Sequence, residues 1–440
     1  MRLRRYPREW LVLALVALAA LPIVNPPNTQ DASRLALTNS ILVRGEVDID
    51  PYRHLTGDRS YYRGHWYTDK APGVSLAVLP PVAALRLVDR ARGANRHFPV
   101  WLRETHLWLI RLWAGGIPFL ALVFLVGRVA EGLAPRTGAA TAVTFGLGTM
   151  LGSLAPTTFG HLPAALLLFG AFLVATRATS ARAWAAVGLL AGLAVLFEYP
   201  AALAALLLAA YAARRAGVGA LGAVAAGAVP PAIVLGAYDQ LAFGSPFRLS
   251  YAYVANAFTE QQRSGLFGIG APTPRGAWFV LLDGHGLLLV SPVVLAAAAG
   301  LVLLGRRHRA EAVVAGAIVA AFAVYTMGYF LPNGGTSPGP RFVAPALPFL
   351  ALGLPPAFSR WRWPTAALAA VSLAVAAFDE ITWAIANTLR LDVWPKTLWS
   401  RAGLPTSVGT LLLLAAVAAA AVVAGSQLLR RGTRSPAVVE

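Results

Sequence analysis

The chain has 440 residues, of which 57% are hydrophobic and 13% are charged, and its formal net charge is +18. Soluble domains carry about 25% charged residues, so the composition excludes an ordinary soluble enzyme, a disordered protein and a collagen-like fibre. The absence of cysteine excludes disulfides, zinc–thiolate sites and iron–sulfur clusters. We therefore predict a helical protein with several membrane spans.

Apolar segments recur along the whole chain. A spanning helix needs about 20 apolar residues, and fewer where it is buried in a bundle. The first segment follows basic residues, as in a signal peptide, but Asn25-Pro26-Pro27 offers no small-residue cleavage site, so we predict that this span is retained. The twelve predicted spans lie near residues 9–25, 106–127, 138–155, 161–176, 183–197, 200–213, 217–239, 285–305, 310–330, 341–358, 364–386 and 407–429.

The apolar segment 73–88 is short, contains Pro80 and Pro81, and ends in charged residues. Basic loops of membrane proteins favour the cytoplasm. If 73–88 does not cross, the cytoplasmic side carries 18 basic and 4 acidic residues, against 19 and 15 outside. We therefore predict an interfacial amphipathic or re-entrant helix at 73–88, with both termini in the cytoplasm.

This orientation leaves four segments outside, at 26–105, 240–284, 331–340 and 387–406, within one predicted domain that covers residues 1–440. Most unusual polar residues fall in these segments or at the outer ends of spans. A carrier often has two related halves with polar residues at mid-span. We find no such repeat, and the concentration of polar residues on one face favours chemistry at the outer membrane surface.

Asp31 begins a predicted helix over residues 31–43, directly outside the first span, with Arg34 one turn later. The helix dipole stabilises an anionic carboxylate at this position. Asp31 therefore serves as a helix cap, as a general base, or as both.

The same outer segment continues with an acidic turn and an aromatic motif. Asp48 and Asp50 either bind a divalent cation or form a solvated turn before a proline. The aromatic residues around Tyr67 suit a membrane-interface belt and also stacking on a sugar ring. Lys70, one of two lysines in the chain, either binds a lipid phosphate, pairs with Asp69, or reaches the lipid headgroups.

Further polar residues lie at the outer ends of spans, where they have either structural or substrate-binding roles. The Gly/Pro-rich segment from Asn333 leads to Arg341, and Arg111 lies at the outer end of the second span. A guanidinium at either position can bind a phosphate through two hydrogen bonds or anchor lipid headgroups. The predicted substrate-binding residues are Tyr67, Asp69, His161, Glu198, Tyr199, His285 and Asn333.

The sequence lacks the motifs of two other common kinds of active site. The chain contains no GxxxxGK[ST] phosphate loop and no HExxH zinc motif. It also has no segment resembling a soluble nucleotide-binding domain, which disfavours a nucleotide-sugar donor bound in the cytoplasm.

The order of these features resembles the GT-C superfamily of membrane glycosyltransferases, which includes protein O-mannosyltransferases, the aminoarabinose transferase of lipid A and related actinobacterial enzymes. Asp31 follows the first span, and Asp69-Lys70-Ala-Pro72 follows about 40 residues later. These positions resemble the family's Asp-Glu and Lys-Pro-Pro motifs, with Ala32 and Ala71 as departures.

Later segments extend the resemblance to bacterial members of the group. They are Phe243-Gly-Ser-Pro with Tyr251, Gly286-Leu-Leu-Leu-Val-Ser-Pro292, and Gly339-Pro-Arg341-Phe. The resemblance implies an all-α polytopic membrane protein, a GT-C-like bundle of about 12 transmembrane helices whose long first outer segment contains juxtamembrane helices.

The resemblance also implies the chemistry. It assigns Asp31 as the general base and Lys70, Arg341 and Arg111 as ligands of the donor phosphate. The implied reaction moves a mannose- or arabinose-like sugar from a polyprenyl-phosphate carrier to an acceptor hydroxyl, with inversion, at the outer face of a bacterial plasma membrane. The acceptor is a glycan, a lipid or a protein, and no nucleic acid is involved. No cofactor is required by the motifs, and a divalent metal is compatible with them.

Two other functions use the same residues. A transporter or flippase of a lipid-linked sugar needs the same arginines and aromatic residues, and facing polar residues at mid-span favour it. A non-catalytic envelope-assembly protein tolerates loss of Asp31 and Lys70.

Overall fold

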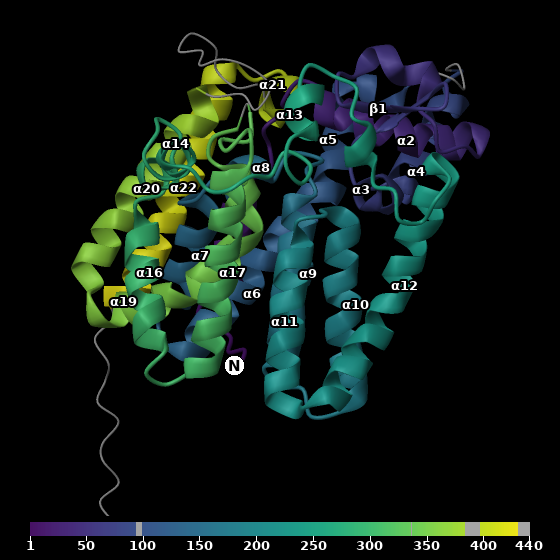
Figure 1. The fold of residues 1–440 in the computed structure, drawn as a ribbon. Helices are drawn as coiled ribbons and strands as arrows, with labels where there is room; N and C mark the ends of the chain where they lie inside the picture. Colours follow the sequence, from purple (N-terminus) through teal and green to yellow (C-terminus); the bar gives the residue numbers. More distant parts are fainter. Residues whose placement is uncertain (94–98, 336, 383–396, 430–440) are drawn as a thin grey trace, which may run out of the picture.

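The computed structural model is a helical bundle with a cap of short helices and loops at one end (Figure 1). It describes residues 1–93, 99–335, 337–382 and 397–429. Within these ranges the regular structure is helical apart from one two-stranded antiparallel sheet. The predicted all-α fold class is therefore confirmed.

Each of the twelve predicted spans coincides with helical structure in the described part of the chain. Six stretches there are long and apolar enough to cross a membrane, and the protein is accordingly a multi-pass membrane protein. The bundle helices are α1 (Glu9–Ala20), α5 (Glu104–Arg111), α6 (Ile117–Leu133), α7 (Gly138–Leu147), α8 (Leu151–Leu154), α9 (His161–Ala175), α10 (Ala181–Phe197), α11 (Ala201–Ala216), α12 (Val218–Phe243), α15 (Leu287–Val290), α16 (Val293–Leu304), α17 (Arg309–Gly328), α18 (Leu347–Leu350), α19 (Leu354–Arg360), α20 (Arg362–Thr382) and α22 (Thr406–Leu429).

Short helical turns join several of these helices. The π-helical turn η3 (Leu112–Gly116) makes α5 and α6 continuous, and the 3₁₀ helices η5 (Arg341–Ala346) and η6 (Ala351–Gly353) lead into α18 and α19. Glycine allows α10 and α12 to pack closely, because a Cβ at Gly188 or Gly227 meets the backbone of the facing helix. Small residues at helix interfaces favour such packing inside membranes.

The first outer segment forms most of the cap. It has its own apolar core, which includes Leu35, Val78 and Trp101, all completely buried. Its elements are α2 (Thr29–Arg44), η1 (Asp50–Leu55), β1 (Arg59–Tyr62), β2 (His65–Thr68), α3 (Gly73–Ala77), α4 (Leu79–Ala91) and η2 (Val100–Leu102).

The cap contains the segment 73–88, which forms α3 and most of α4 beside α2 and α5 (Figure 1). Pro80 and Pro81 lie in the first turn of α4, where a missing backbone N–H costs no hydrogen bond. The segment lies at one end of the bundle and does not run through it, which agrees with the prediction of a non-spanning helix.

The remaining outer segments complete the cap. They contain η4 (Ser250–Tyr253), α13 (Thr259–Arg263), α14 (Pro274–Leu281) and α21 (Leu398–Arg401). The backbone N–H of Ala255 donates to Arg59 at 2.9 Å, which fastens the segment after α12 to the hairpin. Of the predicted outer segment 387–406, residues 387–396 lie outside the described part of the chain.

Candidate functional site

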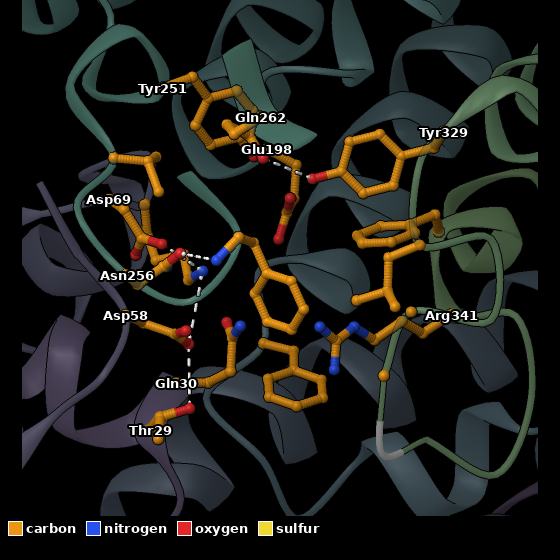
Figure 2. A pocket seen from close by; sticks show the side chains of 18 of the residues that line it. Thr29, Gln30, Asp58, Asp69, Glu198, Tyr251, Asn256, Gln262, Tyr329 and Arg341 are labelled. Carbon is orange, nitrogen blue, oxygen red and sulfur yellow. Dashed lines mark hydrogen bonds and ion pairs between the residues drawn. The ribbon is translucent and has the colours of Figure 1, made fainter. Parts of the chain in front are cut away.

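A cavity of about 340 Å³ lies where the first outer segment meets the turn between α10 and α11, the segment after α12 and the segment before η5. Figure 2 shows side chains from all four regions that point into it. Three basic and three acidic residues line its wall. They are Arg34, Lys70 and Arg341, and Asp58, Asp69 and Glu198.

Lys70 binds two of the three carboxylates. Its Nζ lies 3.0 Å from Asp69 Oδ2 and 3.5 Å from Asp58 Oδ2. Burial raises the pKa of Asp69 to about 6, although Lys70 acts against this shift. Burial also acts to raise the pKa of Asp58, but the Lys70 ammonium and a hydrogen bond from Thr29 hold it below its usual value. The cluster thus sets two carboxylates against one ammonium.

Arg341 is the cation of the cavity that forms no ion pair with a described residue. It is 9% exposed, its Nε donates no hydrogen bond within the described chain, and its guanidinium lies 4.8 Å from the ring centre of Phe159 and 5.4 Å from that of Phe342. Figure 2 shows it reaching into the cavity from the side opposite Asp58. Gly334, at φ 76°, fits against this side chain, because a Cβ there would lie 2.8 Å from its Cγ.

Arg34 and His161 surround the third carboxylate. Arg34 Nη2 lies 3.6 Å from Glu198 Oε1, and the Nδ1 of His161 lies 3.4 Å from the same oxygen. Arg34 also donates from Nη1 to Gln30 Oε1 at 2.5 Å. The predicted substrate-binding residues Asp69, His161 and Glu198 thus all line the cavity, together with the predicted phosphate ligands Lys70 and Arg341.

Asp31 and Arg111 do not line the cavity. Arg111 donates from Nη2 to Asp31 Oδ2 at 2.5 Å and from Nε to Asp31 Oδ1 at 3.3 Å, and both residues are buried. Thr158 donates to Asp31 Oδ1 at 2.8 Å, and Asp31 forms a capping box with Asn28 at the start of α2. The N-cap of α2 is therefore Asn28, and Asp31 is the third helical residue, which completes the capping box, so the predicted N-cap role falls to Asn28. The roles of Asp31 as a base and of Arg111 as a phosphate ligand stay predictions.

The other predicted substrate-binding residues lie around the cavity without lining it. Tyr67 is packed against the ring of Phe243, 5.2 Å between centres, and Tyr199 packs edge-on against Tyr251 at 5.0 Å. Asn333 lines a neighbouring cavity of about 390 Å³, and its side chain accepts from the backbone of Gly335.

The last of these residues, His285, lies between α14 and α15, away from the cavity lining. Its predicted contact with the substrate stays untested.

Several lining residues were not among the predicted site residues. Asp58 and Arg34 lie in segments that the sequence marked as functional, and Arg34 is one helical turn from Asp31. Neither Gln262 nor Tyr329 lies in a sequence motif that marked it as a site residue. Tyr329 donates to Gln262 Oε1 at 3.2 Å, across two outer segments that are remote in sequence.

Asp48 and Asp50, which were considered as ligands of a divalent cation, form hydrogen bonds and ion pairs with protein groups instead. Asp48 accepts from Arg44 at 2.5 Å, and Asp50 accepts from the backbone of Trp66 at 2.7 Å and lies 2.8 Å from His65 Nδ1. Groups of three or more His, Asp or Glu side chains suited to a metal ion are not found among the residues that the structure describes. The solvated-turn interpretation fits this geometry better.

Comparison with solved structures identifies the fold. ArnT from Cupriavidus metallidurans bound to undecaprenyl phosphate superposes with a TM-score of 0.55 at 16% identity, over 96% of this chain and 76% of ArnT. Its apo form gives a TM-score of 0.53 at 16% identity, over 96% and 73%. No protein-family model matches the sequence, and a comparison with curated proteins finds no significant match. The predicted polytopic membrane fold is thereby confirmed as one shared with ArnT.

Proposed function

We propose that this protein is a membrane glycosyltransferase that moves a sugar from a polyprenyl-phosphate carrier to an acceptor hydroxyl at the extracytoplasmic face. The observation that carries this proposal is the buried guanidinium of Arg341, which forms no ion pair with a described residue and lies across the cavity from Asp58. The fold shared with an ArnT structure that contains undecaprenyl phosphate supports the same donor class.

The charge balance of the cavity favours a single phosphate. Lys70 is held by Asp58 and Asp69, and Arg34 lies beside Glu198, so Arg341 is the cation left for an anionic ligand. A sugar-phosphate diester carries one negative charge, which a guanidinium binds through two hydrogen bonds. When the bond to the sugar breaks, the phosphate gains a second charge, and Lys70 stabilises it there.

Aromatic and amide side chains suit the sugar. Tyr251 lines the cavity, and Tyr329 is held in place by Gln262. Such residues stack on sugar rings and hydrogen-bond to hydroxyls. We assign a mannose- or arabinose-like sugar by analogy with the GT-C group alone. We expect inversion at the anomeric carbon because the reaction needs only one displacement.

The reaction needs a proton acceptor for the incoming hydroxyl. The resemblance assigns this role to Asp31, yet both Asp31 oxygens accept hydrogen bonds from other residues and neither faces the cavity. To act as the base, Asp31 must first leave Arg111 and Thr158. We therefore retain Asp31 as a prediction and test it against the carboxylates that line the cavity.

The proposed function is tested with purified protein and a panel of radiolabelled decaprenyl-phospho-sugars, including mannose and arabinose, with release of the sugar from the carrier as the readout. We expect turnover of at least one donor, abolished in Lys70→Ala. If the protein, reconstituted in vesicles, moves intact donor across the bilayer without breaking the bond to phosphate, it is a flippase and the proposal is wrong.

A further inference from the structure

The cavity contains three carboxylates, and Lys70 engages two of them. Asp69 and Asp58 both lie within ion-pair distance of its ammonium, and Asp58 also accepts a hydrogen bond from Thr29. Asp69 leaves its Oδ1 without a hydrogen-bond partner among the described residues, but its Oδ2 holds the lysine that is assigned to the phosphate. Glu198 is the remaining carboxylate of the cavity wall.

The turn between α10 and α11 fixes Glu198. It directly precedes the first residues of α11, and the residue is 8% exposed. Its Oε1 accepts no hydrogen bond from any residue that the structure describes. Burial raises the pKa of this carboxyl, against the opposing charges of Arg34, Lys70 and Arg341. A buried carboxylate oxygen that faces a cavity and has no hydrogen-bond donor can accept the proton of a ligand hydroxyl.

His161 supports Glu198 from the start of α9. Its Nδ1 lies 3.4 Å from Glu198 Oε1, and its ring packs edge-on against Phe159 and Phe342 at 5.8 and 5.7 Å between centres. The rings restrict the imidazole, so that it limits the orientations open to the carboxylate. Position 160 also has to be glycine, because a Cβ there would lie 2.6 Å from Glu198 Oε1.

We propose that Glu198 is the general base of this enzyme, with His161 as its positioning residue. The inference rests on the proposed function. The acceptor oxygen forms a bond to the anomeric carbon while the bond between that carbon and the phosphate oxygen breaks. The hydroxyl proton moves to Glu198, and the bonding electron pair leaves with the polyprenyl phosphate. Glu198 then releases the proton to water.

The test uses water as the acceptor, so that the natural acceptor need not be known. Sugar release from the donor that the wild type uses best is measured for Glu198→Gln and for Asp31→Asn. The matched control is Glu260→Gln, a change of the same kind at an exposed residue of α13. Binding of decaprenyl phosphate is measured on each protein by native mass spectrometry.

We expect Glu198→Gln to lower the turnover rate about 100- to 10,000-fold, the usual size of a general-base contribution, with little change in carrier binding. The fall of wild-type activity at acid pH is expected to disappear in this variant. We expect Glu260→Gln to match the wild type. The His161→Gln variant is expected to shift the acid limb of the pH profile, which a purely structural defect does not do.

Three results overturn the inference. The first is a Glu198→Gln variant with the turnover rate of the wild type. The second is loss of carrier binding in the same variant. The third is an Asp31→Asn variant that keeps its thermal stability but loses turnover while Glu198→Gln stays active. A wild type that turns over no donor of the panel overturns the proposed function itself, so the two failures are distinguishable.

Discussion

The guanidinium of Arg111 binds the carboxylate of Asp31 through both oxygens, across 80 residues of sequence, with both side chains almost completely buried. This pair joins the start of α2 to the end of α5 and thus fixes the cap on the bundle. Arg111 also donates to the backbone carbonyls of Asn25 and Pro26, at 2.5 and 2.8 Å.

Breaking this pair is expected to destabilise the protein. Removal of one partner leaves an uncompensated buried charge, which costs about 3–5 kcal/mol. Arg111→Gln should therefore lower the thermal unfolding temperature in detergent, measured by tryptophan fluorescence. The double variant Asp31→Asn/Arg111→Gln should recover part of the loss. Single variants with wild-type stability would show that the pair does not hold the cap.

Arg341 is expected to dominate affinity for the carrier phosphate. Hydrogen bonds to charged groups contribute about 1.5–3 kcal/mol each, so Arg341→Gln should weaken decaprenyl phosphate binding about 10- to 100-fold. The matched control is Arg263→Gln, an exposed arginine on α13. The dissociation constants are measured by titration. Equal affinity in both variants contradicts the assignment of Arg341.

Protonation of Asp69 is expected to strengthen donor binding. Burial raises the pKa of Asp69 to about 6, so this carboxylate is mostly ionised at pH 7.5 and mostly neutral at pH 5.5. Because it then stops neutralising Lys70, more positive charge faces a phosphodiester whose own charge stays constant. Donor affinity should thus rise as the pH falls over this range, and Asp69→Asn should flatten the dependence. A steeper dependence in that variant is the opposing result.

The raised pKa of Asp69 also makes the stability of the fold depend on pH. A carboxyl whose pKa is higher in the folded than in the unfolded state binds more protons when folded. Asp69 therefore lowers the stability of the fold as the pH rises from about 4 to about 6. In Asp69→Asn we expect a smaller decrease in unfolding temperature across this interval than in the wild type. An unchanged pH dependence would indicate that Asp69 ionises at its ordinary pKa.

Orientation is open to a labelling test because the chain contains no cysteine. Ser264→Cys lies at the end of α13, and Ser180→Cys lies before α10, at the other end of the bundle; both serines are exposed. In intact cells, a membrane-impermeant maleimide should label the first variant and not the second. The reverse pattern contradicts an extracytoplasmic cavity.

The helices were predictable from the sequence, because apolar length and charge asymmetry are local properties. The non-spanning helix at 73–88 followed from the distribution of charged residues, and the location of Asp31 in the first turn of α2 followed from the helical spacing after it. The sequence also marked Lys70, Arg341, His161 and Glu198, since ionisable residues stand out between apolar segments.

The cavity as a whole was not predictable. Gln262 and Tyr329 approach each other only because two loops pair, with the backbone N–H of Gly270 donating to Gly328 at 2.8 Å. The partner of Asp31 is equally remote in sequence. Motif spacing in the sequence identifies a candidate carboxylate. The packing of distant segments decides whether its oxygens are already hydrogen-bonded.

A structure of the protein with a bound polyprenyl-phospho-sugar, determined by cryo-electron microscopy, tests the central claim most directly. The account predicts the phosphate within hydrogen-bond distance of Arg341 and near Lys70, with the sugar toward Tyr251 and Glu198. A phosphate bound in the neighbouring cavity beside Arg275 and Asn333, with Arg341 still unpaired, would contradict it.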